Sequence, residues 1–175
     1  HPSIMEFSLK HWSQSKRSNQ ADPRILHCAI YSLEKMADGG IFDHLAGAFC
    51  RYSTDELWMI PHFERMLYDN GPLLSLYSQA WKINSDPLFF NTVCETADWV
   101  IREMQSVDGG YCSEQGADAE GSEGKFFVWS KDELTSLFTA AIADTEITAE
   151  SIELFKTRFG LNLAAKFEGA WHLHG

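Results

Sequence analysis

The chain has 175 residues, of which 45% are hydrophobic, so it is long enough to bury the core of one domain of ordinary size. Its 25 Asp and Glu residues outnumber its 14 Lys and Arg residues, and the net charge of -11 argues against a nucleic-acid or anionic-membrane partner. No apolar run approaches the roughly 20 residues that span a bilayer, and no signal-peptide pattern opens the chain. We therefore expect a single domain over residues 1–175.

The cysteines indicate a reduced compartment. All four are scattered without a C-x-x-C pair, and the chain has no N-x-S/T glycosylation acceptor. Free cysteines are among the most buried residue types, so we expect ordinary buried thiols in a cytoplasmic protein. The chain begins at His1 rather than Met and ends without a helix-ending signal, so we expect it to be a piece of a longer protein.

Two helices are predicted before residue 40, the first of them over residues 3–15. The second begins at Pro23, because Asp22 is a typical N-cap residue and proline is favoured in the first turn. Gly39 is expected to end this helix in the left-handed conformation. The expected buried faces consist of Met5, Leu9 and Trp12 in the first helix, and of Leu26, Ala29, Ile30, Leu33 and Ala37 in the second.

A third helix is predicted to begin at Pro61. Proline removes a backbone donor and clashes with the preceding turn, so Gly71 and Pro72 predict a kink or a break near Asn70. The expected buried stripe consists of Phe63, Met66, Leu67, Leu74, Tyr77 and Trp81.

Three more helices follow. The first begins after the cap signal Asp86–Pro87 and runs to about Val107. Residues 130–133, Ser-Lys-Asp-Glu, have the spacing of a capping box and predict a short helix that ends near Ala143. Thr148 is expected to cap a last helix.

Two long polar segments lie between the predicted helices. The first segment runs from Asp38 to Asn70, the second from Asp108 to Trp129, and each opens with Asp-Gly-Gly and an apolar residue. Connections of this length are usually functional or disordered, and the frequent aromatics argue against disorder. Since connections between antiparallel helices alternate between two ends, both segments should lie at one end and residues 84–85 at the other. We predict that the two segments, with short irregular strands, form two walls of one site.

His62 is the predicted general base of that site. On the expected third helix, His62, Arg65 and Asp69 share one face, while Glu64 and Tyr68 share another. Imidazole titrates near neutral pH, a carboxylate can hold its tautomer, and the helix N-terminus would disfavour its cation. The alternative is a capping or packing histidine beside a solvated face of ion pairs.

The first segment also carries the side chains that sugar recognition needs. Polar groups match sugar hydroxyls, and flat aromatic rings cover the apolar face of a sugar ring. The alternative for each aromatic residue is a place in the core. The candidate substrate-binding residues are His44, Arg51, Tyr52, Trp58, Glu64, Asp69, Glu123 and Trp129.

Three acids of the second segment, Asp118, Glu120 and Glu123, can raise one another's pKa if they share a dry pocket. A carboxylate pair would suit glycoside hydrolysis, whereas one acid with His62 would suit proton transfer next to a carbonyl, as in an epimerase. The alternative is an acidic loop that only contacts solvent. The candidate catalytic residues are therefore His62, Asp118, Glu120 and Asp43.

No metal or cofactor is predicted. The histidines and cysteines lack the paired spacing of a zinc site, and the acidic segment does not match an EF-hand loop. Neither a nucleotide-phosphate loop nor a nicotinamide fingerprint is present, and the alternating His172 and His174 near the end are interpreted as incidental.

Two runs of sequence resemble a known family. GGIFDHLAGAFCRYSTDELWMIPHFERMLYDN, residues 39–70, is similar to the signature of the YyaL/spermatogenesis-associated protein family, and ADAEGSEGKFFVW, residues 117–129, resembles its acidic-glycine segment. The similarity extends over most of residues 1–170. It implies a longer parent that joins a thioredoxin-like domain to an (α/α) toroid, similar to N-acylglucosamine 2-epimerases and six-hairpin glycosidases, which handle sugars.

The chain departs from the family pattern in two places. Gly116 stands where the acidic segment of the family has its first Asp, and Ala119 stands for a Ser, so one candidate carboxylate is lost. The glycine-rich step is altered by Ala46, Ala48 and Cys50, which changes how closely another backbone can approach it.

These observations predict an all-α fold, a partial (α/α) toroid of helical hairpins with small β pieces in its long loops. Six helix pairs need about 300 residues, so only the first part of a toroid is expected here. The first functional hypothesis is a carbohydrate-processing enzyme of the epimerase or glycosidase type. The second is a non-catalytic helical module that binds a sugar-like ligand or a protein partner. Exposed apolar edges of a partial toroid would also favour a homo-oligomer.

Overall fold

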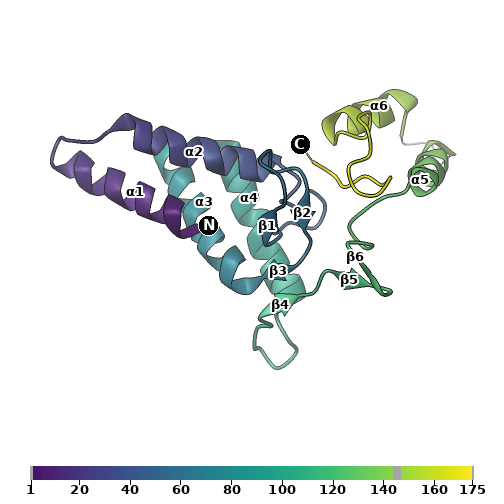
Figure 1. Ribbon diagram of the computed structural model, residues 1–175, viewed down its shortest axis with the longest axis horizontal. Coiled ribbons are helices and arrows are strands. Elements are labelled where there is room, and N and C mark those ends of the chain that lie inside the picture. The colour runs from purple at the N-terminus through teal and green to yellow at the C-terminus, as the bar shows by residue number, and fades with distance from the viewer. Residues whose placement is uncertain (1, 144–146, 175) are drawn as a thin grey trace.

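The computed structural model describes residues 2–143 and 147–174, and most of them are helical. Four helices, α1 to α4, pack together, and α5 and α6 lie beyond the small strands (Figure 1). No helix in the two described ranges is long and apolar enough to cross a bilayer. The elements are α1 Pro2–Arg17, α2 Pro23–Asp38, β1 Tyr52–Ser53, β2 Pro61–His62, β3 Arg65–Met66, α3 Leu67–Asn84, α4 Pro87–Trp99, the π-helical turn η1 Val100–Met104, β4 Glu114–Gln115, β5 Asp118–Ala119, β6 Ser122–Glu123, α5 Lys131–Ala143 and α6 Ala149–Arg158. The prediction of a mostly helical chain with small irregular strands is confirmed.

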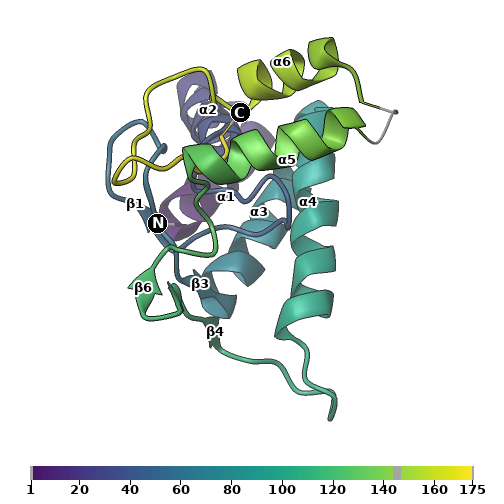
Figure 2. The same ribbon diagram turned by 90° about the vertical axis from the view of Figure 1, so that its right-hand side faces the viewer.

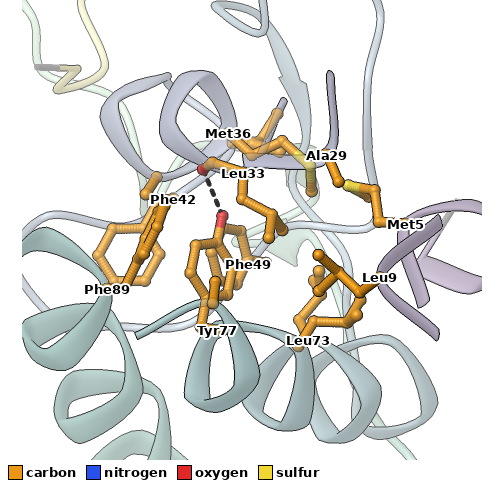
Figure 3. Close-up of a cluster of buried hydrophobic side chains, with 14 residues drawn as sticks. Met5, Leu9, Ala29, Leu33, Met36, Phe42, Phe49, Leu73, Tyr77 and Phe89 are labelled. Atoms are coloured by element: carbon orange, nitrogen blue, oxygen red, sulfur yellow. Dashed lines mark hydrogen bonds between the residues drawn. The ribbon is translucent and has the colours of Figure 1, made fainter. Parts of the chain in front are cut away.

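The largest core cluster lies between the first four helices and the start of the first segment (Figure 3). Tyr77 on α3 donates its hydroxyl to the Leu33 carbonyl on α2 over 2.7 Å, and its ring stacks on Phe49 with 5.2 Å between centroids. A phenol inside a core usually needs such a partner, because its polar end is shielded from water. The first segment therefore packs against the four helices at the centre of this core cluster.

The predicted helix caps are confirmed. Asp22 and Asp86 each accept a backbone N–H from the first turn of the helix that follows. Ser130 and Glu133 form the reciprocal bonds of a capping box, and Thr148 accepts the N–H of Ser151. These starts are set by residues within four positions of one another, which is why sequence spacing locates them.

The predicted start of the third helix at Pro61 is wrong, since α3 begins at Leu67. The residues before it are extended, because β2 pairs with β1 and β3 pairs with β4, both antiparallel. A proline also disfavours the helical conformation in the residue that precedes it. The two helical faces predicted for residues 62–69 therefore do not exist, and His62 does not lie at a helix N-terminus.

The prediction about Gly39 is also wrong, and the predicted break in α3 is absent. Gly39 has a φ of −79° and ends α2 in an extended rather than a left-handed conformation. A side chain is excluded for a different reason, because a Cβ there would lie 2.5 Å from the carbonyl oxygen of Trp58. Helix α3 continues through Gly71 and Pro72 without a break. Because proline has no N–H, the backbone bond from position 72 to the carbonyl of Tyr68 is missing.

Some side chains expected inside the protein lie outside it. Trp81 is 39% exposed, because the core face of α3 is formed by neighbouring positions of the helix. Of the four cysteines, Cys50 is buried, whereas Cys28, Cys94 and Cys112 are exposed. The prediction of four buried thiols therefore holds at one position.

Candidate functional site

The two polar segments meet, as predicted. Strand β3 of the first segment pairs with strand β4 of the second segment. Phe63 stacks on Phe127 with 5.3 Å between ring centroids and an interplanar angle of 6°. Figure 2 shows β3, β4 and β6 at one side of the helices, near the start of α3. Residues 43–62 and 116–129 thus belong to one region of the molecule.

Within this region, the twelve predicted site residues do not form one group. An outer cavity contains Arg51, Tyr52, Trp58 and Asp69, a surface cluster contains His62, Glu64 and Glu123, an aromatic cavity contains Asp43, His44 and Trp129, and a hairpin carries Asp118 and Glu120.

The outer cavity has a volume of about 500 Å³ and lies between residues 50–58 and the start of α3. Trp58 is held in the left-handed conformation, with a φ of 62°. The turn around it is fixed by Asp55, whose Oδ1 accepts the N–H groups of Met59 and Ile60 at 2.9 Å each. Left-handed conformations of non-glycine residues are strained and concentrate at functional sites. The wall of the cavity is therefore built by a constrained turn.

Asp69 is the buried acid of the outer cavity. Its side chain lies in the first turn of α3, lines the cavity, and the residue is 8% exposed. Burial raises the pKa of Asp69, although the nearby charge of Arg51 opposes the shift. A carboxyl group with a raised pKa in a cavity is a recurring feature of functional sites.

His62 lies beside the outer cavity in a cluster of charges. Its Nε2 is 3.2 Å from Glu123 Oε1, and its Nδ1 is 3.7 Å from Glu64 Oε2. The ring stacks on Tyr52 with 5.1 Å between centroids, and Arg51 donates to Glu64 over 3.1 Å. His62 thus has the predicted carboxylate partners, although they are Glu64 and Glu123 rather than an acid one or two helical turns away.

The aromatic cavity lies behind the surface cluster and has a volume of about 300 Å³. Asp43 and Arg65 form a buried ion pair in its wall, with exposures of 17% and 3%. The Arg65 guanidinium lies 4.4 Å from the centroid of the Phe127 ring. Oδ1 of Asp43 accepts the N–H groups of Leu45 and Ala46. Because its oxygens are engaged in this way, Asp43 holds the loop in place, and nothing in its contacts supports the predicted catalytic role.

Two imidazoles line the aromatic cavity, and both are in the neutral form near pH 7. Burial lowers the pKa of His44, whose Nε2 donates to the Gly39 carbonyl over 3.1 Å. Burial lowers the pKa of His172 to about 4. The interpretation of His172 as incidental is wrong, since it packs against Gly40 so closely that a Cβ there would lie 2.1 Å from the imidazole.

The hairpin of β5 and β6 carries Asp118 and Glu120 away from both cavities. Both residues are exposed, and Glu120 is paired with Lys125. The side-chain hydrogen bond from Lys125 lowers the pKa of Glu120, which is the opposite of the shift predicted for three acids in a dry pocket. Within the described ranges, no three His, Cys, Asp or Glu side chains are gathered closely enough to hold a metal ion.

The sequence interpretation missed Arg65 and His172 as cavity residues. Arg65 was placed on a helix face, whereas β3 turns it inwards. His172 returns to the first segment because Trp171 bridges to Trp129 through two backbone hydrogen bonds of 2.6 and 2.9 Å. Neither placement can be predicted from local spacing. Arg65 depends on the pairing of β3 with β4, and His172 depends on the bonds between Trp129 and Trp171, which are far apart in the chain.

His172 predicts a loss of stability on acidification. Its folded pKa of about 4 lies below the unfolded value of about 6.5, so between these values only the unfolded chain binds the proton. The stability that the neutral His172 side chain contributes is therefore fully present above about pH 6.5 and is lost as the pH falls towards about 4. We expect the unfolding free energy of the His172→Gln variant to fall by about 2 kcal/mol less than that of the unmodified chain between about pH 7 and about pH 4.5.

Urea unfolding curves at the two pH values measure this difference, and His11→Gln, at an exposed position on α1, is the matched control. Equal pH dependence of the His172→Gln variant and the unmodified chain would show that the His172 imidazole titrates normally in the folded state.

Comparisons with known proteins give one consistent result. The chain is 33% identical to spermatogenesis-associated protein 20 of Mus musculus over 184 aligned residues, which cover 99% of the chain and 23% of that protein. The Homo sapiens protein of the same name is 33% identical over 93% of the chain and 21% of its own length. An uncharacterized protein of Caenorhabditis elegans is 36% identical over 69% of the chain and 17% of its length.

No protein-family model matches the chain. The chain spans about a quarter of the length of the curated relatives it matches, and the matched part includes both cavities and the surface cluster between them. The similarity over nearly the whole chain supports placing it in the spermatogenesis-associated protein 20 family.

Proposed function

We propose that the outer cavity binds a sugar or a sugar-like ligand and that His62 exchanges a proton with it. The observation that carries this proposal is the meeting of four predicted binding residues, Arg51, Tyr52, Trp58 and Asp69, in one cavity with His62 stacked on Tyr52 at its edge.

The lining of the outer cavity suits a polar ring. Its volume of about 500 Å³ lies in the range of small-molecule sites. Tyr52 and Trp58 can cover the C–H face of a sugar, while Arg51 and Asp69 can bind hydroxyl groups. Asp69 lines the cavity, and a ligand hydroxyl could donate a hydrogen bond to its carboxyl group.

His62 is arranged for proton transfer. The His62 side chain is 28% exposed but its Nδ1 is buried, so Nε2, beside Glu123, is the nitrogen that can exchange a proton, while Glu64 lies 3.7 Å from Nδ1. A proton taken from a carbon next to a carbonyl would leave its electron pair in an enolate, and two carboxylates would stabilise the imidazolium that forms. Return of the proton to the opposite face of that carbon completes an epimerisation. Asp69, with its raised pKa, is the candidate proton donor.

The second candidate function is a non-catalytic module that binds the same class of ligand. Asp118 and Glu120, two of the predicted catalytic acids, are exposed on the hairpin and line neither cavity. A glycosidase would need two carboxyl groups facing one bond, so this placement favours epimerisation or simple binding over hydrolysis.

We also propose that α1 to α4 are the first two hairpins of an (α/α) toroid in a longer parent that carries a thioredoxin-like domain. The two hairpins lie side by side, with the polar segments gathered near the start of α3 (Figure 1). Apolar side chains of α5 and α6 are exposed and support self-association, among them Leu137, Ile142 and Leu154.

Hydrogen exchange in heavy water tests the proposed function. The 175-residue chain is incubated with a panel of aldoses, ketoses and N-acylated amino sugars, and NMR follows deuterium entering the carbon next to the carbonyl. We expect exchange with at least one sugar, and a rate lower by about 10²- to 10⁴-fold in the His62→Gln variant. Asp69→Asn should weaken saturation-transfer signals from the sugar, while His11→Gln, at an exposed position outside both cavities, should leave both readouts unchanged.

Binding without exchange would reject the enzyme and support the non-catalytic module. Absence of both binding and exchange across the panel would contradict the sugar assignment for this cavity altogether.

A further inference from the structure

We propose that the aromatic cavity is a second binding site, separate from the sugar site, and that it takes a small uncharged aromatic compound with one hydroxyl group, of the phenol class. Its lining differs from that of the outer cavity except at Cys50, which lies in the wall of both. Binding there would be independent of the proposed proton transfer.

The walls are flat rings that are fixed in place. Three stretches of chain supply the rings of Phe42, of Phe63, and of Phe127 with Trp129, and the ring of Phe126 stands edge-on to Phe127. Phe63 is pinned from behind by Gly124, where a Cβ would lie 2.6 Å from its ring. A volume of about 300 Å³, at the lower end for small-molecule sites, suits a compound of about one ring. Rings prefer aromatic neighbours in stacked or edge-on geometry, so an aromatic guest is matched.

The cavity presents no net charge. The charge of Arg65 is compensated by Asp43, which also accepts two backbone N–H groups. His44 and His172 contribute neutral imidazoles, because burial lowers the pKa of each. Burial also raises the pKa of the Cys50 thiol to about 11, so it stays protonated. A carboxylate or an ammonium group would enter without a counter-ion, so an uncharged guest is favoured.

Two polar atoms of the wall are incompletely satisfied. Nε of Arg65 and Nε2 of His172 are buried without a hydrogen bond of good geometry, although Arg65 interacts with the Cys50 thiol and His172 with the Met59 backbone. Buried polar groups are almost always bonded, so a hydroxyl that reaches either atom would complete its hydrogen bonding. One hydroxyl can accept from the Arg65 N–H or bond to the imidazole. A sugar carries several hydroxyls, most of which would lie unmatched against the rings, so this cavity selects for a single polar group.

Three ring compounds of similar size test the assignment on the 175-residue chain. Phenol, toluene and benzoate are compared by saturation-transfer NMR and by titration of the thermal midpoint. We expect phenol to bind most tightly, toluene to bind more weakly because it leaves the polar atoms unmatched, and benzoate not to bind. Equal binding of phenol and benzoate, or binding of neither phenol nor toluene, would overturn the proposal.

Two variants locate the site. Ala46→Phe fills the cavity without touching the backbone bonds of Ala46, and it should abolish phenol binding. Phe126→Ala removes a ring that is exposed enough not to affect folding, and it should weaken phenol binding about tenfold. Tyr52→Ala, in the outer cavity, is the matched control and should leave phenol affinity unchanged.

The same variants separate this proposal from the sugar site. Sugar binding that is lost in Tyr52→Ala but kept in Phe126→Ala, with the reverse pattern for phenol, supports two independent sites. Phenol binding that survives both Ala46→Phe and Phe126→Ala would place the compound elsewhere and would contradict the inference, whatever the sugar results show.

Discussion

Replacing Arg65 by Met is expected to lower the free energy of unfolding by about 3–5 kcal/mol. The substitution keeps most of the side-chain volume but leaves Asp43, which is 17% exposed, without its partner. The guanidinium contact with Phe127 is lost as well. A charge stranded in this way is costly because the surrounding rings cannot solvate it. Urea unfolding followed by circular dichroism measures the change.

A second Arg–Asp pair in the same chain provides the control. Arg24 and Asp22 form a salt bridge at the start of α2, where the arginine side chain is 88% exposed. Exposed ion pairs contribute little to stability, so Arg24→Met should be nearly neutral. The double variant Asp43→Asn with Arg65→Met should recover part of the lost stability. Similar losses for Arg65→Met and Arg24→Met would show that the inner pair is not buried as described.

The helix starts were predictable because their signals are local. Asp86 before Pro87 and the capping box at Ser130 place the acceptor and the donors that it satisfies within one turn of chain. The start of α3 was not predictable from spacing, because residues 61–66 satisfy their backbone groups across β1 and β4. Periodicity in one window cannot report a partner strand some fifty residues away in the chain.

The meeting of the two segments was predicted, whereas their division into two cavities was not. In extended chain, neighbouring side chains point to opposite sides. His62 therefore joins the surface cluster, while the next residue, Phe63, lines the aromatic cavity. The helical interpretation of these residues gathered His62, Arg65 and Asp69 on one face, but the structure distributes them among three places. The prediction thus described two cavities as one site, because it assumed helical spacing where the chain is extended.

Asn70 has the same kind of long-range role, and the sequence marked it only as the place of a break. It is fully buried and fastens the first segment to α3. Its Oδ1 accepts the Phe49 N–H over 2.7 Å, and its Nδ2 donates to the carbonyls of Phe49 and Met66 over 2.9 and 3.1 Å. Three backbone groups depend on one side chain.

Asn70→Leu is therefore expected to lower the unfolding free energy by about 3 kcal/mol or more, since each buried group left unpaired costs about 1–3 kcal/mol. Leucine keeps the branched shape and the number of side-chain heavy atoms of asparagine but is larger, so no cavity forms and the loss combines the missing hydrogen bonds with some repacking. Amide hydrogen exchange at Phe49 should accelerate by at least as much as that of the α2 core. Asn84→Leu, at the exposed end of the same helix with a single hydrogen bond to the N–H of Asp86, should cost about 1 kcal/mol or less. Equal effects at the two asparagines would mean that the first segment, and with it both cavities, is held by packing alone.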